Sequence, residues 1–210
     1  MKRIGVLASG RGSNLQALID SWQQGKLGGE LVAVGSDQEG AFALKRAQAA
    51  GIPFQVFPLS KYSSRREQEK GLLAWLKEQN VELLVLAGYM RILSKEFLQE
   101  LKIPVLNIHP SLLPAFPGLA AQKQALEYGV KVSGCTVHFV DEGLDSGPII
   151  LQGAVPVLPG DTVESLSERI LQVEHQIYPE AVRLVASELV KVNGRQVINL
   201  EKKPQDNLGE

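Results

Sequence analysis

Short apolar runs alternate with amphipathic stretches along this chain, and that alternation constrains its fold more than any other feature of the sequence. A run such as Leu83 to Ala87 predicts a fully buried strand. The stretch from Leu15 to Trp22 places its apolar residues on one face of a helix. Because strands and helices follow one another in turn, the pattern is typical of βαβ units around a parallel sheet.

The first half of the chain is predicted to supply the parallel strands and the helices that cover them. The predicted strands are residues 4–8, 31–34, 54–57, 83–87 and 105–108. The predicted helices are residues 15–22, 41–50 and 94–101, with a further helix opening at Ser64 and Glu67, whose spacing matches a capping box.

The second half departs from this pattern. Residues 132–140 and 149–157 are strand-like runs with no helix between them, which favours antiparallel pairing. We therefore predict an α/β fold with an open, mostly parallel, Rossmann-like sheet and an antiparallel C-terminal extension. No repeat, low-complexity tract or linker divides the sequence, so we predict a single domain over residues 1–210 with a polar tail from about residue 201.

Two further signals lie near the C-terminal end. Asp161 and Glu164 have capping-box spacing and predict a long helix that reaches about Glu188, with a disturbance at Pro179. The dipeptide Asn193-Gly194 predicts a closing hairpin.

Charge and apolar length exclude several classes of partner. The 22 basic and 23 acidic side chains leave a net charge of −1, which gives no overall field to hold nucleic acid or an anionic membrane. Residues 103–122 carry no charge but include four prolines, which predict a loop region in place of a membrane span. The apolar stretch after Arg3 is too short for a signal peptide, and the single cysteine, Cys135, cannot form an internal disulfide. We expect a cytoplasmic protein with small-molecule partners.

The segment Ser9-Gly10-Arg11-Gly12-Ser13-Asn14 lies between a predicted strand and a helix, where unpaired backbone N–H groups bind anions. Glycines permit close approach, and Ser13 and Asn14 add side-chain donors, so a phosphate suits this loop. A dinucleotide fingerprint needs a third glycine where Leu15 stands, and the P-loop lysine is missing. Asp37 could still bind a ribose hydroxyl, so a nicotinamide cofactor stays an alternative, as does a plain tight turn.

Asn107 and His109 lie at the carboxyl end of a predicted strand, the edge at which open α/β sheets bind ligands. Residues two apart on a strand share a face, so an amide and an imidazole should project together, able to polarise a carbonyl and move a proton. Asp145, in a glycine-rich turn, is a candidate carboxylate partner for the imidazole. The alternative is a structural histidine in a proline-rich loop.

Five segments carry a resemblance to a known family: SGRGSNLQAL (9–18), LAGYMRIL (86–93), NIHPSLLP (107–114), VHFVDEGLDSGP (137–148) and QVEHQIYP (172–179). Together they resemble the phosphoribosylglycinamide formyltransferases, and the match spans nearly the whole chain. The segments around His109 and Asp145 alone would indicate only the wider family of folate-dependent formyltransferases.

This resemblance implies formyl transfer from 10-formyltetrahydrofolate to the amine of 5-phosphoribosylglycinamide in de novo purine biosynthesis, with no metal and no NAD. Asn107 and His109 match the family's catalytic amide and histidine, and Asp145 matches the acid that raises the pKa of the family's histidine. The implied substrate-binding residues are Gly12, Ser13, Asn14, Gln172 and Glu174. The implied folate-binding residues are Arg65, Met90, Arg91, Ile92 and Leu93. The resemblance also implies a cis peptide bond between Leu113 and Pro114.

Several of these residues have structural alternatives. Without the resemblance, Arg65 is a solvated residue at a helix start, and Met90 to Leu93 are a strand end. His138 and Cys135 are expected to be structural, and His175 to lie near the substrate wall without catalysing. The pair Ser36-Asp37 and the stretch Ala120-Ala121-Gln122 depart from the family pattern, which leaves secondary contacts open.

Two other classes of function remain as alternatives. A formyl-folate hydrolase would share Asn107, His109 and Asp145 and use water, but such relatives look longer, with an added N-terminal segment; the transfer-RNA formylating relatives carry an extra C-terminal domain. We therefore expect the transferase. A non-catalytic nucleotide-binding module would keep the glycine-rich loop without needing an ordered amide, imidazole and carboxylate.

Overall fold

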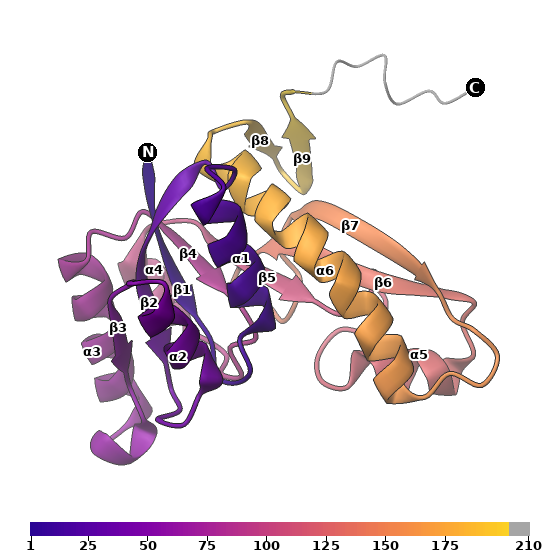
Figure 1. Cartoon of the computed structure of the whole chain (residues 1–210), viewed down its shortest axis with the longest axis horizontal. Helices are drawn as coiled ribbons and strands as arrows, with labels where there is room; N and C mark the ends of the chain where they lie inside the picture. Colours follow the sequence, from indigo (N-terminus) through magenta and orange to yellow (C-terminus); the bar gives the residue numbers. More distant parts are fainter. Residues whose placement is uncertain (202–210) are drawn as a thin grey trace.

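A seven-stranded sheet with the order β3-β2-β1-β4-β5-β6-β7 runs through the computed structural model, which describes residues 1–201 (Figure 1). Strands β1 to β5 pair in parallel, and β6 and β7 join them antiparallel. The predicted fold class is therefore confirmed; the tail predicted from residue 201 lies almost wholly outside the described residues. The strands are β1 (Lys2–Leu7), β2 (Gly29–Ser36), β3 (Phe54–Val56), β4 (Leu83–Leu86), β5 (Val105–His109), β6 (Val132–Phe139) and β7 (Ile149–Pro156).

Helices cover both faces of the sheet, and each face has its own apolar core. Successive side chains of a strand point to opposite faces. Val6 of β1 therefore packs in one core with residues of α1, α2 and α6, whereas Leu7 packs in the other with Trp75 of α3 and Phe97 of α4. The helices are α1 (Ser13–Gln23), α2 (Phe42–Ala49), α3 (Arg65–Glu78), α4 (Lys95–Leu101), α5 (Ala121–Tyr128) and α6 (Val163–Ala186), with a 3-10 turn at Leu59–Lys61.

Helix α6 lies across β5, β6 and β7 and packs against α1 (Figure 1). Its Tyr178 is fully buried, and the hydroxyl donates to the carbonyl oxygens of Leu86 (2.8 Å) and Leu106 (3.3 Å). Burial raises the pKa of this hydroxyl, so it stays a donor. One side chain thereby fastens α6 to β4 and β5. No helix within residues 1–201 combines the length and the apolar character that crossing a membrane requires.

The capping box predicted from Asp161 and Glu164 is wrong. Thr162 caps α6: its hydroxyl accepts from Ser165 N, and the Ser165 hydroxyl accepts from Thr162 N. The Asp161 carboxylate instead accepts two hydrogen bonds from Arg169, at 2.8 and 2.9 Å, so the guanidinium takes the acceptor that a cap would use. The helix continues through the buried Pro179.

Two other local predictions need correction. The uncharged range of residues 103–122 is predicted to be a loop region, but it contains β5, as residues 105–108 predict, and α5 begins at Ala121, after the last proline of the range. The predicted hairpin is confirmed as β8 (Val190–Asn193) and β9 (Gln196–Asn199). Its turn is Gly194-Arg195 and not Asn193-Gly194, because Asn193 already pairs with Gln196.

Candidate active site

The carboxyl ends of β1, β4 and β5 lie side by side, and the loops that follow them carry most of the predicted site residues. Leu7 pairs with Leu86, and Leu86 pairs with Asn107, so the three strands end at the same edge of the sheet. In open α/β sheets this is the edge that binds ligands.

The loop between β1 and α1 requires a glycine at position 12. Gly12 has a φ of +69°, and a Cβ built on it would lie 2.8 Å from both Cα and Cβ of Ala43. Gly12 is also the N-cap of α1, whose first turn carries no acidic residue. The first N–H groups of a helix have no partner within it, so this turn offers donors and a partial positive charge to an anion.

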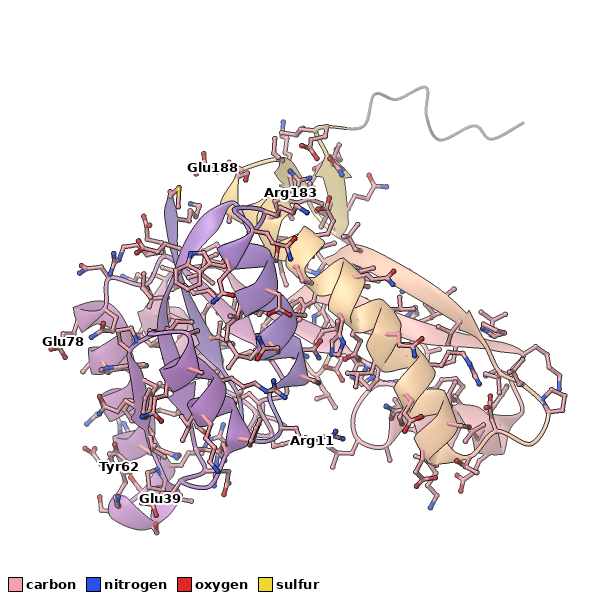
Figure 2. The ribbon with its side chains drawn as sticks, viewed as in Figure 1. Arg11, Glu39, Tyr62, Glu78, Arg183 and Glu188 are labelled. Atoms are coloured by element: carbon pink, nitrogen blue, oxygen red, sulfur yellow. The ribbon has the colours of Figure 1, made fainter. Side chains whose placement is uncertain are left out.

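Two arginines add positive charge around this loop. Arg46 of α2 donates to the carbonyl oxygen of Arg11 (3.0 Å) and to Gln16 (2.8 Å). These bonds connect α2 to the loop and to α1. Arg11 itself is exposed and projects from the loop (Figure 2). Together with the start of α1, these side chains make the surroundings of Ser13 favourable for an anion.

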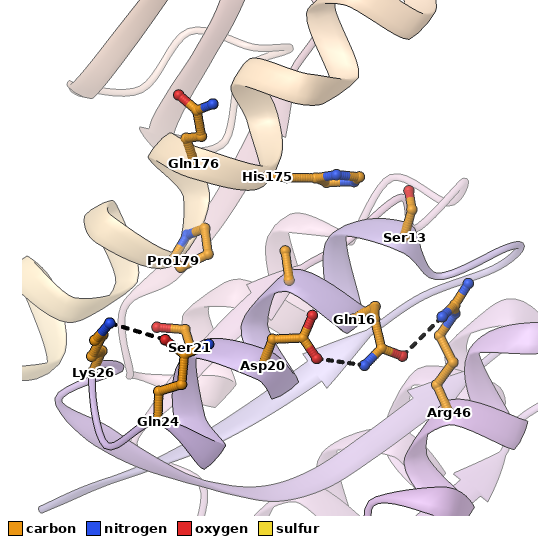
Figure 3. Close-up of a pocket in the computed structure, with 11 residues that line it drawn as sticks. Ser13, Gln16, Asp20, Ser21, Gln24, Lys26, Arg46, His175, Gln176 and Pro179 are labelled. Carbon is orange, nitrogen blue, oxygen red and sulfur yellow. Dashed lines mark hydrogen bonds between the residues drawn. The ribbon is translucent and has the colours of Figure 1, made fainter.

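A groove of about 730 Å³ lies between α1 and α6 beside the same loop (Figure 3). Ser13, Arg46 and His175 line it, and His175 points from α6 toward Ser13 (Figure 3). The His175 Nε2 atom is buried and lacks a hydrogen-bond partner among the described residues. Burial and then the charge of Arg46 lower the pKa of His175, so its ring favours the neutral form.

Asn14 at the start of α1 contacts Glu174 of α6. The Asn14 side-chain N–H donates to Glu174 Oε2 at 2.7 Å, and both residues are buried. Burial raises the pKa of Glu174, although the bond from Asn14 opposes the shift. Gln172 is exposed and does not join this pair, because residues two apart on a helix lie about 200° apart around its axis.

His109 has an oxygen atom against each ring nitrogen. Its Nδ1 lies 3.3 Å from Asp145 Oδ2, and its Nε2 donates to the carbonyl oxygen of Phe116 at 2.8 Å. Asp145 Oδ2 also accepts from Gly118 N at 2.8 Å. The peptide bond between Leu113 and Pro114 is cis, as the resemblance implies, and it precedes Phe116 and Gly118 in the chain. Both ring nitrogens of His109 therefore face oxygen acceptors.

His138 completes the cluster from β6, where it lies opposite Asn107 in the antiparallel register. Its Nδ1 lies 2.8 Å from the carbonyl oxygen of Phe139, which accepts, so Nε2 is left as the acceptor for the Asn107 amide 3.4 Å away. Burial lowers the pKa of His138, which keeps the ring neutral in this role. Asp145 Oδ1 lies 3.8 Å from the same Nε2. The structure thus brings Asn107, His109 and Asp145 together.

The segment after β4 combines exposed side chains with a tethered backbone. Met90 is 77% exposed and Ile92 is 69% exposed, whereas Leu93 is buried. Arg65, the first residue of α3, donates to the carbonyl oxygen of Ile92. Glu69 of the same helix accepts from Ser94 N. Four of the five predicted folate-binding residues form this segment, and the fifth, Arg65, binds its backbone at Ile92.

The sequence did not predict the roles of His138 and Asp37 in this arrangement. The sequence predicts a hydrogen-bonded structural histidine at His138, and the ring is hydrogen-bonded, but its contact with Asn107 depends on a strand register that periodicity does not give. The sequence leaves Asp37 as a possible partner for a ribose hydroxyl, but its carboxylate is engaged by side chains of the protein. Cys135 is buried, and burial raises the pKa of its thiol to about 12. Within residues 1–201, no group of three or more His, Cys, Asp or Glu side chains is placed to hold a metal ion.

The sequence and the fold of this chain are both similar to those of known proteins. The sequence model of the formyl transferase family matches residues 2–182. A crystal structure of glycinamide ribonucleotide transformylase 1 from Symbiobacterium toebii has a TM-score of 0.93 and 53% sequence identity, covering 95% of this chain and 94% of the other.

Curated relatives agree with that likeness. The phosphoribosylglycinamide formyltransferase of Bacillus subtilis is 40% identical over 195 residues, which is 93% of this chain and 98% of the relative. The trifunctional purine biosynthetic protein adenosine-3 of Drosophila pseudoobscura pseudoobscura is 52% identical over 188 residues. This chain covers only 14% of the length of that much larger protein.

Proposed function

Since the chain belongs to the formyl transferase family, we propose that it transfers a formyl group from 10-formyltetrahydrofolate to the amine of 5-phosphoribosylglycinamide, a step of purine biosynthesis. One observation carries the proposal: the cluster of Asn107, His109 and Asp145 lies at a sheet edge that also bears an anion-binding helix start and a partly exposed segment. A phosphorylated acceptor and an aromatic donor would then reach the cluster from different loops.

The acceptor would be held by its phosphate and its ribose. Gly12, Ser13 and Asn14 present the start of α1 to the phosphate, and the nearby arginines favour the same charge. Glu174, already fixed by Asn14, would accept a ribose hydroxyl. We assign Gln172 to the outer part of this wall, because it is exposed and lies on another face of α6.

The donor would bind along the segment after β4. Exposed Met90 and Ile92 offer apolar contact to the pteridine and benzoyl rings. The backbone of Arg91 to Leu93, apart from the Ile92 carbonyl that Arg65 binds, would bond the pteridine edge. Arg65, about half exposed, provides a cation for the glutamyl carboxylates.

Within the cluster, each residue would serve a separate part of the reaction. The acceptor amine attacks the formyl carbon, and the formyl oxygen becomes an oxyanion that the Asn107 amide stabilises. His109 would carry the proton lost by the amine to N10 of the folate as the bond between N10 and the formyl carbon breaks. Asp145 would stabilise the protonated imidazole and fix its orientation. Transfer through Nε2 requires its hydrogen bond to Phe116 to break.

Incubation with 10-formyltetrahydrofolate, with and without 5-phosphoribosylglycinamide, tests the proposal. We expect tetrahydrofolate to form only with the acceptor present, with one formylated acceptor for each tetrahydrofolate. Equal turnover without the acceptor would identify a formyl-folate hydrolase instead. No turnover in either arm would contradict both activities.

A further inference from the structure

The carboxylate of Asp37 connects the loop after β1 to the segment after β4. Asp37 follows β2 directly and is 3% exposed. Its Oδ1 accepts from the Ser9 hydroxyl at 2.5 Å, and the Ser9 oxygen in turn accepts from Met90 N at 2.9 Å. Its Oδ2 accepts from Arg91 Nε at 3.0 Å and from Gln38 at 2.9 Å.

Both oxygens of Asp37 are thus occupied inside the protein, so this carboxylate is not placed to bind a substrate. Burial alone would raise the pKa of Asp37, but the bonds from Ser9, Gln38 and Arg91 outweigh it and hold the pKa below its ordinary value. Asp37 therefore stays ionised at neutral pH and retains the full attraction of the guanidinium.

We propose that Asp37 is a positioning residue that fixes the anion-binding loop and the donor-binding segment relative to one another through Ser9 and Arg91. The ligands assigned to these two segments rest on the proposed function, but the hydrogen bonds that connect the segments do not. Because protein donors engage both oxygens of the carboxylate, its effect on activity would be exerted through the two loops.

The ion pair has an asymmetry that a test can use. The Asp37 side chain is 2% exposed, whereas that of Arg91 is 33% exposed. Arg91→Gln would leave a buried carboxylate without its main counter-charge, which is a costly state. Asp37→Asn would leave a guanidinium that can turn toward water. We therefore expect Arg91→Gln to lower Tm by about 6 °C or more, Asp37→Asn to lower it less, and the double variant to recover most of the loss.

Hydrogen exchange measures the connection without any substrate. In Asp37→Asn the Ser9 hydroxyl loses its charged anchor, so the amide of Met90 should exchange about tenfold faster. The amide of Leu84, bonded to the carbonyl oxygen of Pro104 inside the sheet, should exchange at an unchanged rate. Unchanged protection of Met90, or additive Tm losses in the double variant, would overturn the inference even if the protein is a formyltransferase.

Steady-state kinetics on the full chain then locate the effect. Asp37→Asn should raise KM for 10-formyltetrahydrofolate and for 5-phosphoribosylglycinamide by about 5- to 30-fold, with kcat within about threefold of the parent. Glu39→Gln is the matched control, because Glu39 is a neighbouring acid that lies at the surface and pairs with exposed Lys61 (Figure 2). Its KM values should not change. A fall in kcat with both KM values unchanged would overturn the positioning role, whereas an inactive parent would refute the proposed function and leave the exchange result standing.

Discussion

His109 at the end of β5 and Asp145 in the loop between β6 and β7 meet with His109 Nδ1 3.3 Å from Asp145 Oδ2. Asp145 reaches this position with a φ of +49°, a backbone conformation that non-glycine residues seldom adopt. A strained residue persists only where its surroundings hold it, and here Gly118 N and the imidazole do so. The contact therefore leads to two kinetic predictions.

His109→Ala should lower kcat by about 10²- to 10⁴-fold, the range in which a positioned acid or base contributes. KM for both substrates should stay within about threefold, because phosphate and folate would be held by other loops. Steady-state kinetics with the authentic acceptor and saturating donor measures this. A variant that keeps near-parental kcat would refute the catalytic role of His109.

Asp145→Asn should also lower kcat, by removing the charge that stabilises the protonated imidazole. Groups that act as a unit lose their shared function once, so the double variant with His109→Ala should be within about threefold of the worse single variant. Comparing the four proteins as a double-mutant cycle gives the answer. Multiplicative losses would show that the two side chains act independently.

Gly12→Ala should destabilise the protein and weaken binding of the acceptor. The added Cβ would overlap Ala43 and would sit on a backbone at φ +69°, so we expect Tm to fall by about 5 to 10 °C. Gly10→Ala is the control, because a Cβ there meets no atom within 4 Å and Gly10 has no positive φ. Thermal unfolding of both variants decides the matter: equal Tm values would show that the loop tolerates a Cβ at position 12.

Glu174→Gln should change the pH dependence of stability. Because burial raises the pKa of Glu174 above its ordinary 4.5, the folded state favours the protonated acid. The stabilising contribution is present below pH 4.5 and is lost as pH rises through the folded-state pKa. The Tm of Glu174→Gln minus that of the parent should therefore increase between pH 4.5 and pH 8.

The exposed Glu168→Gln, on the same helix, controls for the loss of a carboxylate. Its Tm difference from the parent should stay nearly flat over this range. Parallel curves for Glu174→Gln and Glu168→Gln would argue against a buried, destabilised carboxylate at Glu174.

The periodicity of apolar residues predicted the strands and helices that bury an apolar face. The strand at Leu83–Leu86 and the helix face of Leu15 and Leu18 need only a hydrophobic pattern, and that pattern survives tertiary packing. The proximity of Asn107 and His109 to a sheet edge followed in the same way, because the edge is fixed once the strands are parallel.

Sequence periodicity does not predict contacts that depend on strand register or on which of several polar groups binds a side chain. His138 meets Asn107 only because β6 pairs with β5 in one antiparallel register. Asp161 does not cap α6, because Thr162 is the N-cap and the Asp161 carboxylate accepts from Arg169, two turns along the helix, and from Leu158 N. In both cases the deciding partner is distant from the motif, so local spacing does not contain it.

The bond between Asn14 and Glu174 closes a separation of 160 residues, and Tyr178 reaches back from the same helix to Leu86 and Leu106. A ribosome making this chain therefore releases the anion-binding loop long before the helix that walls it. Strands β1 to β5 pair only with one another and with β6, so they can condense before α6 is made, but the proposed acceptor site would be assembled last. A nascent chain that stops short of α6 would carry the loop and β5 but would lack Glu174, the residue proposed to hold the ribose of the acceptor.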